Sequence, residues 1–182
     1  YDPGPEMNLA ARAAKLGVEP VALAHDILTA GDDTAALCMP AVNFSKNSIE
    51  AVETMIRDEN TILGLGDGGA HCGMICDGSL TTHMIERWSD AGRGDMPVAQ
   101  VIKALTSETA QAVGLNDRGL IKPGYRADLN VIDTTRIGVG RHEIIADLPD
   151  GGRRLHQNAT GYDATIVAGE VTYRNGVATG AL

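Results

Sequence analysis

The fold is indicated most directly by residues 61–71, which read TILGLGDGGAH. Residues 61–66 form a short and largely apolar run, which is typical of a strand buried on both faces of a parallel sheet. The residues from Asp67 to His71 then form a polar, glycine-rich loop. Loops that follow parallel strands gather at the carboxyl edge of the sheet, where α/β enzymes place their sites. Asp67 is therefore the first candidate functional residue.

The residues of this loop leave several roles open for Asp67. A carboxylate at this position can ligate a cation, accept a proton from a bound water, or hydrogen-bond its own loop. Gly68 and Gly69 follow directly and would let backbone or substrate approach closely. His71 lies four residues beyond Asp67 and is a candidate for substrate contact.

Other patterns of reactive residues give weaker evidence for a functional site. His71, Cys72 and Cys76 lack the second donor pair that a structural zinc site requires, and Cys38 is isolated. The serines near His83 lie outside any nucleophile elbow, so a serine hydrolase is not supported. The three cysteines give no disulfide framework, which favours a reducing cytoplasm.

The amino-acid composition limits the classes of protein to which this chain can belong. The 182 residues are 43% hydrophobic and 21% charged, as expected of a globular protein. The net charge of −9 argues against binding to nucleic acid or an anionic membrane. It arises within residues 1–91, which carry 5 basic and 14 acidic side chains. No apolar run approaches the ~20 residues of a membrane span.

The rest of the chain predicts βα units followed by a small β unit. Caps and periodicity predict helices at 6–16, 21–30, 47–57, 79–89 and 97–113, and buried strands at 35–42 and 61–66. Short strands are expected at 129–133, 164–168, 171–174 and 177–179, with hairpin turns at Gly169-Glu170 and Asn175-Gly176. Residues 134–163 are interpreted as a long loop. We therefore place residues 1–115 in one domain and residues 116–182 in another.

Three stretches also carry a family resemblance. They are residues 63–71 (LGLGDGGAH), 104–115 (ALTSETAQAVGL) and 118–133 (RGLIKPGYRADLNVID). Together they resemble the carboxyl-terminal part of the metal-dependent amidohydrolases, and within them the D-aminoacylase (N-acyl-D-amino-acid deacylase) group. The resemblance implies an α/β fold, namely the C-terminal part of a (β/α)8 TIM barrel followed by a small antiparallel β (sandwich) unit. The predicted strands at 35–42 and 61–66 would be its last two barrel strands.

The resemblance also implies a mechanism. Asp67 matches the aspartate after the final barrel strand, which contacts a divalent metal, expected to be zinc, and shuttles a proton. Gly68, Gly69 and His71 would shape the pocket for a small-molecule amide substrate. The implied reaction is hydrolysis of a linear amide C–N bond.

The chain departs from the family in its metal ligands. It contains no His-x-His motif, and a full barrel needs ~250 residues. We therefore expect a piece of a longer protein that begins before Tyr1, lacks most metal ligands and is inactive alone. We also expect it to self-associate or to be completed by the missing N-terminal part. The alternatives are a non-catalytic binding or assembly module, and an amidohydrolase acting on a cyclic amide or a deaminated base.

Overall fold

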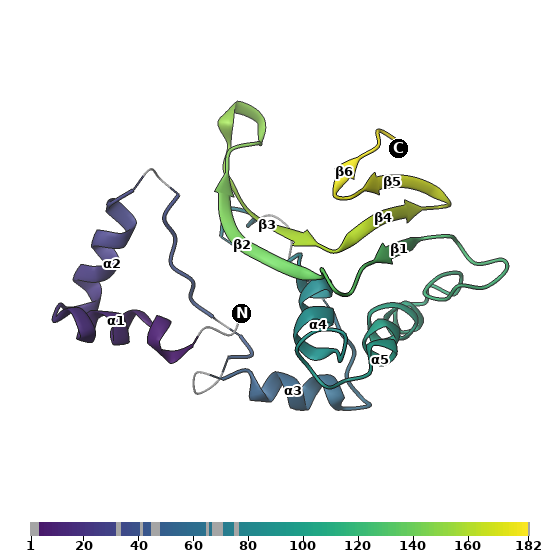
Figure 1. Ribbon diagram of the computed structural model, residues 1–182, viewed down its shortest axis with the longest axis horizontal. Coiled ribbons are helices and arrows are strands. Elements are labelled where there is room, and N and C mark those ends of the chain that lie inside the picture. Colours follow the sequence, from purple (N-terminus) through teal and green to yellow (C-terminus); the bar gives the residue numbers. More distant parts are fainter. Residues whose placement is uncertain are drawn as a thin grey trace. The chain divides into compact units, whose positions relative to one another are not determined.

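A computed structural model describes residues 4–31, 34–40, 42–44, 48–64, 66, 71–74 and 77–181 (Figure 1). The chain divides into two units, Tyr1–Thr61 and Ile62–Leu182. The predicted domain boundary at 115/116 lies inside the second unit and stays a prediction.

Helices dominate the first unit, and local capping signals explain where they begin and end. They are the short 3₁₀ turn η1 (Pro5–Met7), α1 (Leu9–Leu16), α2 (Pro20–Thr29) and α3 (Glu50–Arg57). The Asn8 side chain accepts a hydrogen bond from the Ala10 N–H at 2.8 Å and caps α1. Gly17 ends the same helix with a φ of 69°. The helices predicted at 6–16, 21–30 and 47–57 are confirmed in place, but α1 begins only at Leu9 and α3 at Glu50, and residue 47 lies outside the described residues.

The two predicted barrel strands do not appear in the described residues. Residues 35–40, 42, 61–64 and 66 adopt no strand conformation. A strand requires a paired neighbour, so an apolar run without a backbone partner does not form one. The strand prediction is therefore wrong for these residues, and the barrel itself stays a prediction.

Helices also form the first half of the second unit. They are α4 (Leu80–Trp88), α5 (Val98–Lys103), the π-helical turn η2 (Ala104–Glu108) and α6 (Thr109–Ala112). The core of this half includes Met84, Ile85, Trp88 and Val101, each exposed by no more than 4%. The helix predicted over 97–113 is confirmed, with a π-helical turn inside it.

The second half of this unit is antiparallel β structure. Strands β1 (Leu129–Ile132), β4 (Tyr162–Val167), β5 (Glu170–Arg174) and β6 (Val177–Ala178) form one sheet in the order β1-β4-β5-β6. The turn at Asn175-Gly176 has positive φ at both residues, as predicted. The preceding turn is Ala168-Gly169 rather than Gly169-Glu170, because Glu170 already pairs with Val167.

A second antiparallel pair replaces the long loop predicted at 134–163. Strands β2 (Gly138–Ile145) and β3 (Arg154–Thr160) form a hairpin whose tip contains the short turn η3 (Pro149–Gly151). Neither strand alternates between buried and exposed residues, so neither shows the period-2 pattern that predicts a half-buried strand. The antiparallel part of the predicted fold is confirmed, and its sandwich arrangement stays a prediction.

Candidate functional site

The predicted site lies in residues 66–79, here called the Asp67 segment. Asp67, Gly68 and Gly69 lie outside the described residues, so their proposed roles stay predictions. His71 is described and exposed, at the start of a turn in which the Met74 N–H donates to the His71 carbonyl at 2.8 Å. Of the four predicted site residues, the structure thus describes His71.

The described ends of this segment lie side by side. A Cβ at Gly66 would lie 2.8 Å from the Asp77 carbonyl oxygen and 3.2 Å from the Gly78 Cα. The chain therefore enters and leaves the segment at neighbouring points, and only glycine fits at the entrance.

Strand β3 holds the middle of the segment. The Leu155 N–H donates to the Cys72 carbonyl at 2.8 Å. This contact joins the loop to the β2–β3 hairpin, which the sequence placed in an unstructured region. No local pattern in the sequence signalled it.

The helix after the segment is fixed to the β structure by polar side chains. The Ser79 hydroxyl donates to the Gln157 side-chain carbonyl, and the Gln157 amide donates to the Gly140 carbonyl at 2.9 Å. Further along, Thr82 and the Tyr162 hydroxyl share a hydrogen bond of 2.8 Å. These contacts come from one side of α4, which packs against β2 (Figure 1).

Glu86 and His83 lie on the same side of α4 as Thr82. A Glu86 carboxylate oxygen accepts from the Val139 N–H at 3.1 Å, and the other pairs with Arg93 at 2.9 Å. Burial lowers the pKa of His83 from 6.5 to about 4, so its imidazole is neutral near pH 7. No local pattern in the sequence indicated that His83 is partly buried.

The described residues do not by themselves form a metal centre. Within the described ranges, no three His, Cys, Asp or Glu side chains lie close enough together to hold an ion. Cys72 is half-buried and Cys38 is exposed, and both are free thiols. A metal site through Asp67 would draw on donors beyond this set.

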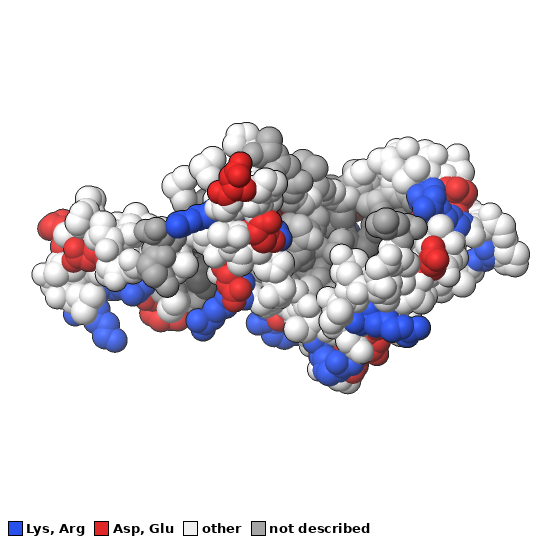
Figure 2. Space-filling view, turned by 90° about the horizontal axis from the view of Figure 1, so that it is seen from above, with Lys and Arg blue, Asp and Glu red and all other residues white. Residues whose placement is uncertain are grey.

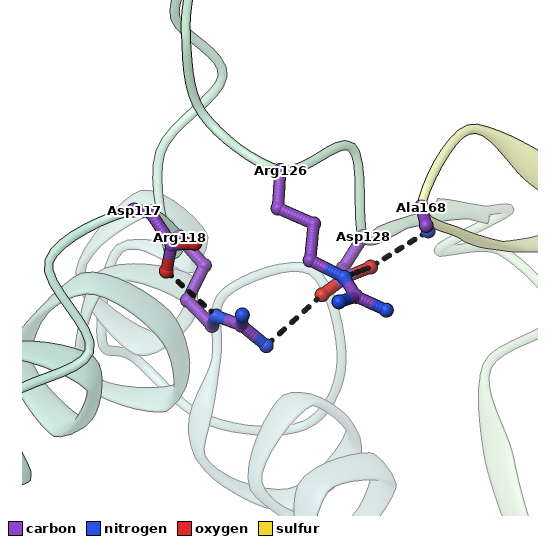
Figure 3. Close-up of polar contacts among 5 residues, drawn as sticks. All are labelled: Asp117, Arg118, Arg126, Asp128 and Ala168. Atoms are coloured by element: carbon purple, nitrogen blue, oxygen red, sulfur yellow. Dashed lines mark hydrogen bonds and ion pairs between the residues drawn. The ribbon is translucent and has the colours of Figure 1, made fainter.

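A charged cluster lies within and next to the third resemblance stretch, residues 118–133 (Figure 3). Asp128 accepts from the Ala168 N–H at 2.8 Å and from Arg126 at 3.0 Å. The backbone N–H of Ala168 is the main reason that the pKa of Asp128 lies below its usual value. Arg118 pairs with Asp117 at 3.0 Å and reaches Asp128 at 3.5 Å. These contacts tie the start of β1 to the turn between β4 and β5, which is a structural role.

Surface charge is mixed on the face shown in Figure 2, where described Lys and Arg side chains lie next to Asp and Glu side chains. Among the described helices, none combines the length and apolar character that a membrane-spanning helix needs.

Comparison with known proteins connects these features to a family. The chain aligns with the 5-methylthioadenosine/S-adenosylhomocysteine deaminase of Pelotomaculum thermopropionicum at 31% identity over 127 residues, 68% of this chain and 29% of that protein. The enzyme of the same name from Desulfitobacterium hafniense is 29% identical over 92 residues, 50% of this chain and 21% of its own length. Adenine deaminase 1 of Agrobacterium fabrum is 54% identical over 41 residues, 22% of this chain and 7% of that protein.

The matched part of the chain thus spans under a third of each of these curated relatives. No solved structure matches the chain. A model of the Amidohydrolase family matches residues 6–173, which is most of the sequence. The chain therefore belongs to the amidohydrolase family.

Proposed function

We propose that this chain contributes Asp67 to the active site of a metal-dependent hydrolase that cleaves a C–N bond. The observation that carries the proposal is the family match over residues 6–173, because this stretch contains the Asp67 segment.

The roles of the site residues follow from their chemistry. Asp67 would accept a proton from the attacking water and deliver it to the departing amine. His71, which is exposed in its turn, can contact a substrate, and Gly68 and Gly69 would leave room for it. A bound divalent ion, for which zinc is our candidate, supplies polarisation of the scissile group and acidifies a water.

The substrate class has two candidates. The resemblance of residues 63–71, 104–115 and 118–133 to the D-aminoacylase group favours a linear N-acyl-D-amino acid. The relatives, which bear the names of adenosine-type and adenine deaminases, favour hydrolytic release of ammonia from an aminopurine. Both reactions break a C–N bond, and they differ in the amine that leaves.

One experiment separates these candidates. The natural polypeptide that contains this sequence is purified, its metal content is measured, and it is assayed with N-acetyl-D-amino acids, adenine, 5-methylthioadenosine and S-adenosylhomocysteine. Free D-amino acid indicates deacylation and ammonia indicates deamination. Turnover of neither class by a metal-loaded protein would contradict the proposal, and a protein without metal or turnover would favour a non-catalytic module.

Substitution of Asp67 tests its role directly. Asp67→Asn keeps the size of the side chain but removes the proton acceptor, so kcat should fall by about 10²- to 10⁴-fold. Asp150→Asn is the control, because Asp150 is an exposed carboxylate at the tip of the β2–β3 hairpin. Retained activity in Asp67→Asn would remove Asp67 from the mechanism.

We further propose that the 182-residue chain alone self-associates or binds the rest of an amidohydrolase barrel. Large apolar side chains are exposed in both units, among them Val21 at 80%, Met39 at 85% and Ile121 at 89%. Where such side chains form a contiguous patch, that patch commonly becomes covered by a partner. Light scattering tests the proposal, and a monodisperse monomer would contradict it. The isolated chain should be inactive on both substrate classes.

A further inference from the structure

The turn between β5 and β6 contains a chemically labile pair of residues. Asn175 is the only asparagine in the sequence that is followed by glycine. Asparagine is one of the less chemically stable side chains, and a following glycine has no Cβ that would obstruct a reaction at its own nitrogen. Both residues are exposed, and both have positive φ, 48° for Asn175 and 77° for Gly176. Water can therefore reach the pair.

The reaction available to this pair is deamidation. The Gly176 nitrogen gives up its proton and attacks the carbonyl carbon of the Asn175 side chain. The new C–N bond closes a five-membered succinimide ring, the C–N bond of the side-chain amide breaks, and its nitrogen leaves with that proton as ammonia. One water then opens the ring. Attack of water on the former side-chain carbonyl gives aspartate, and attack on the main-chain carbonyl gives isoaspartate.

The folded turn holds this reaction back. The Asn175 N–H donates to the Asp163 carbonyl on β4 at 3.0 Å, and the pairing of Arg174 with Val177 closes the turn. To reach the side-chain carbonyl carbon, the Gly176 nitrogen must rotate about the Cα–C bond of Asn175. That rotation moves the peptide that leads into β6, so the reaction depends on opening of this strand.

Strand β6 is short and is held by few contacts. It consists of the exposed residues Val177 and Ala178 and lies at the edge of the sheet β1-β4-β5-β6. Directly after it, the Thr179 N–H donates to the Thr172 carbonyl at 2.9 Å. The Thr179 hydroxyl lies 2.6 Å from the Val171 carbonyl oxygen and 3.1 Å from that of Thr172. Segments with few buried contacts open at a low cost in free energy, so these bonds of Thr179 limit how often β6 opens.

We propose that Asn175 is a site of spontaneous deamidation, and that the contacts of Thr179 set its rate by keeping the β5–β6 turn closed. Isoaspartate carries the main chain through one additional methylene carbon, so a two-residue turn no longer aligns Arg174 with Val177. Either product also adds a negative charge at the turn. Formation of isoaspartate should therefore release β6 from the edge of the sheet. This inference does not depend on the proposed activity.

The test uses the natural polypeptide, kept at mildly alkaline pH, with mass spectrometry of proteolytic peptides to measure aspartate and isoaspartate at residue 175. Thr179→Val removes the hydroxyl and keeps the size of the side chain. Loss of one ordinary hydrogen bond should make opening of β6, and therefore deamidation, about 2- to 12-fold faster. Thr179→Ser keeps the hydroxyl and should react at nearly the original rate. Thr165→Val is the matched control and should leave the rate unchanged, because the Thr165 hydroxyl donates to Asn130 on β1 at 3.0 Å.

Two comparisons within the same protein complete the test. Asn130 and Asn158 are each followed by a residue with a Cβ, and deamidation at residue 175 no faster than at these positions would overturn the site. The chain unfolded in urea gives the unrestrained rate, which should exceed that of the folded protein. Equal rates in the folded and unfolded chain, or in Thr179→Val and the unsubstituted protein, would overturn the control by β6. The fluorescence of the buried Trp88 checks that each variant is folded.

Discussion

Gly119 offers a sharp test of how the third resemblance stretch packs. Its φ is +83°, and a Cβ built there would lie 2.8 Å from the Cα of Ser107, 3.0 Å from the Ser107 nitrogen and 3.0 Å from the Thr106 carbonyl carbon. All three atoms belong to the backbone of the π-helical turn η2. A flexible side chain could move aside, whereas moving a helix backbone would cost considerable free energy.

The cost of Gly119→Ala has two parts. A left-handed conformation costs a residue with a Cβ about 1–2 kcal/mol. Forcing an extra carbon into a packed contact costs about 1–3 kcal/mol more. We therefore expect the free energy of unfolding to fall by about 2–5 kcal/mol.

Gly124→Ala is the matched control. Gly124 has a φ of +85°, nearly the same as Gly119, but a Cβ there would meet no atom within 4 Å. Its substitution should therefore cost only the conformational part, about 1–2 kcal/mol. The effect of alanine on the unfolded chain is the same at both sites and cancels in the comparison.

Urea unfolding followed through the single tryptophan measures this difference. Trp88 is 4% exposed and lies in the core of the same unit, so its fluorescence reports the unfolding of that unit. Gly119→Ala should be less stable than Gly124→Ala by about 1–3 kcal/mol. Equal losses of stability would refute the close approach of residue 119 to η2.

Three further predictions use the same assay. Asp133, whose hydrogen-bond partners hold its pKa at about 2 instead of 3.8, should stabilise the fold above pH 4. That contribution should disappear as the pH falls through about 2, and Asp133→Asn should remove this part of the pH dependence. His83 has a pKa of about 4 when folded and 6.5 as its ordinary value, so the unfolded chain binds more protons between these values. Stability should therefore decrease from pH 6.5 to 4, and His83→Gln should flatten that slope, whereas an unchanged slope would contradict the burial of this imidazole. Thr82→Val should cost about 0.5–1.5 kcal/mol through loss of the bond to Tyr162, while Thr81→Val at an exposed position should cost less. Equal costs would argue against that bond.

Elements that depend on local chemistry could be predicted from the sequence. Gly17 ends α1 with a positive φ, and Asn175-Gly176 forms the expected turn, because both features follow from the residue at the position itself. The antiparallel strands around these turns were correct for the same reason. The predicted amidohydrolase family was also confirmed, since it rested on local motifs.

Elements that depend on distant partners could not be predicted. Residues 35–40 are apolar enough for a strand, yet the described residues form none there. Strands β2 and β3 show the opposite case, because they pair without the alternating pattern that identifies a strand. In both cases, whether a strand formed depended on hydrogen-bond pairing with another strand rather than on the hydrophobicity of the segment.

The candidate site combines these two kinds of information. An Asp-Gly-Gly sequence after an apolar run indicated the candidate segment, because a carboxylate among glycines is a local signal. Its supports are not local, since Ser79 and Gln157 are 78 positions apart and Thr82 and Tyr162 are 80 apart. A reactive group needs both a suitable side chain and a fixed place. In this protein the candidate side chain lies in residues 66–71, and the described contacts of Ser79 and Thr82 come from residues about eighty positions later.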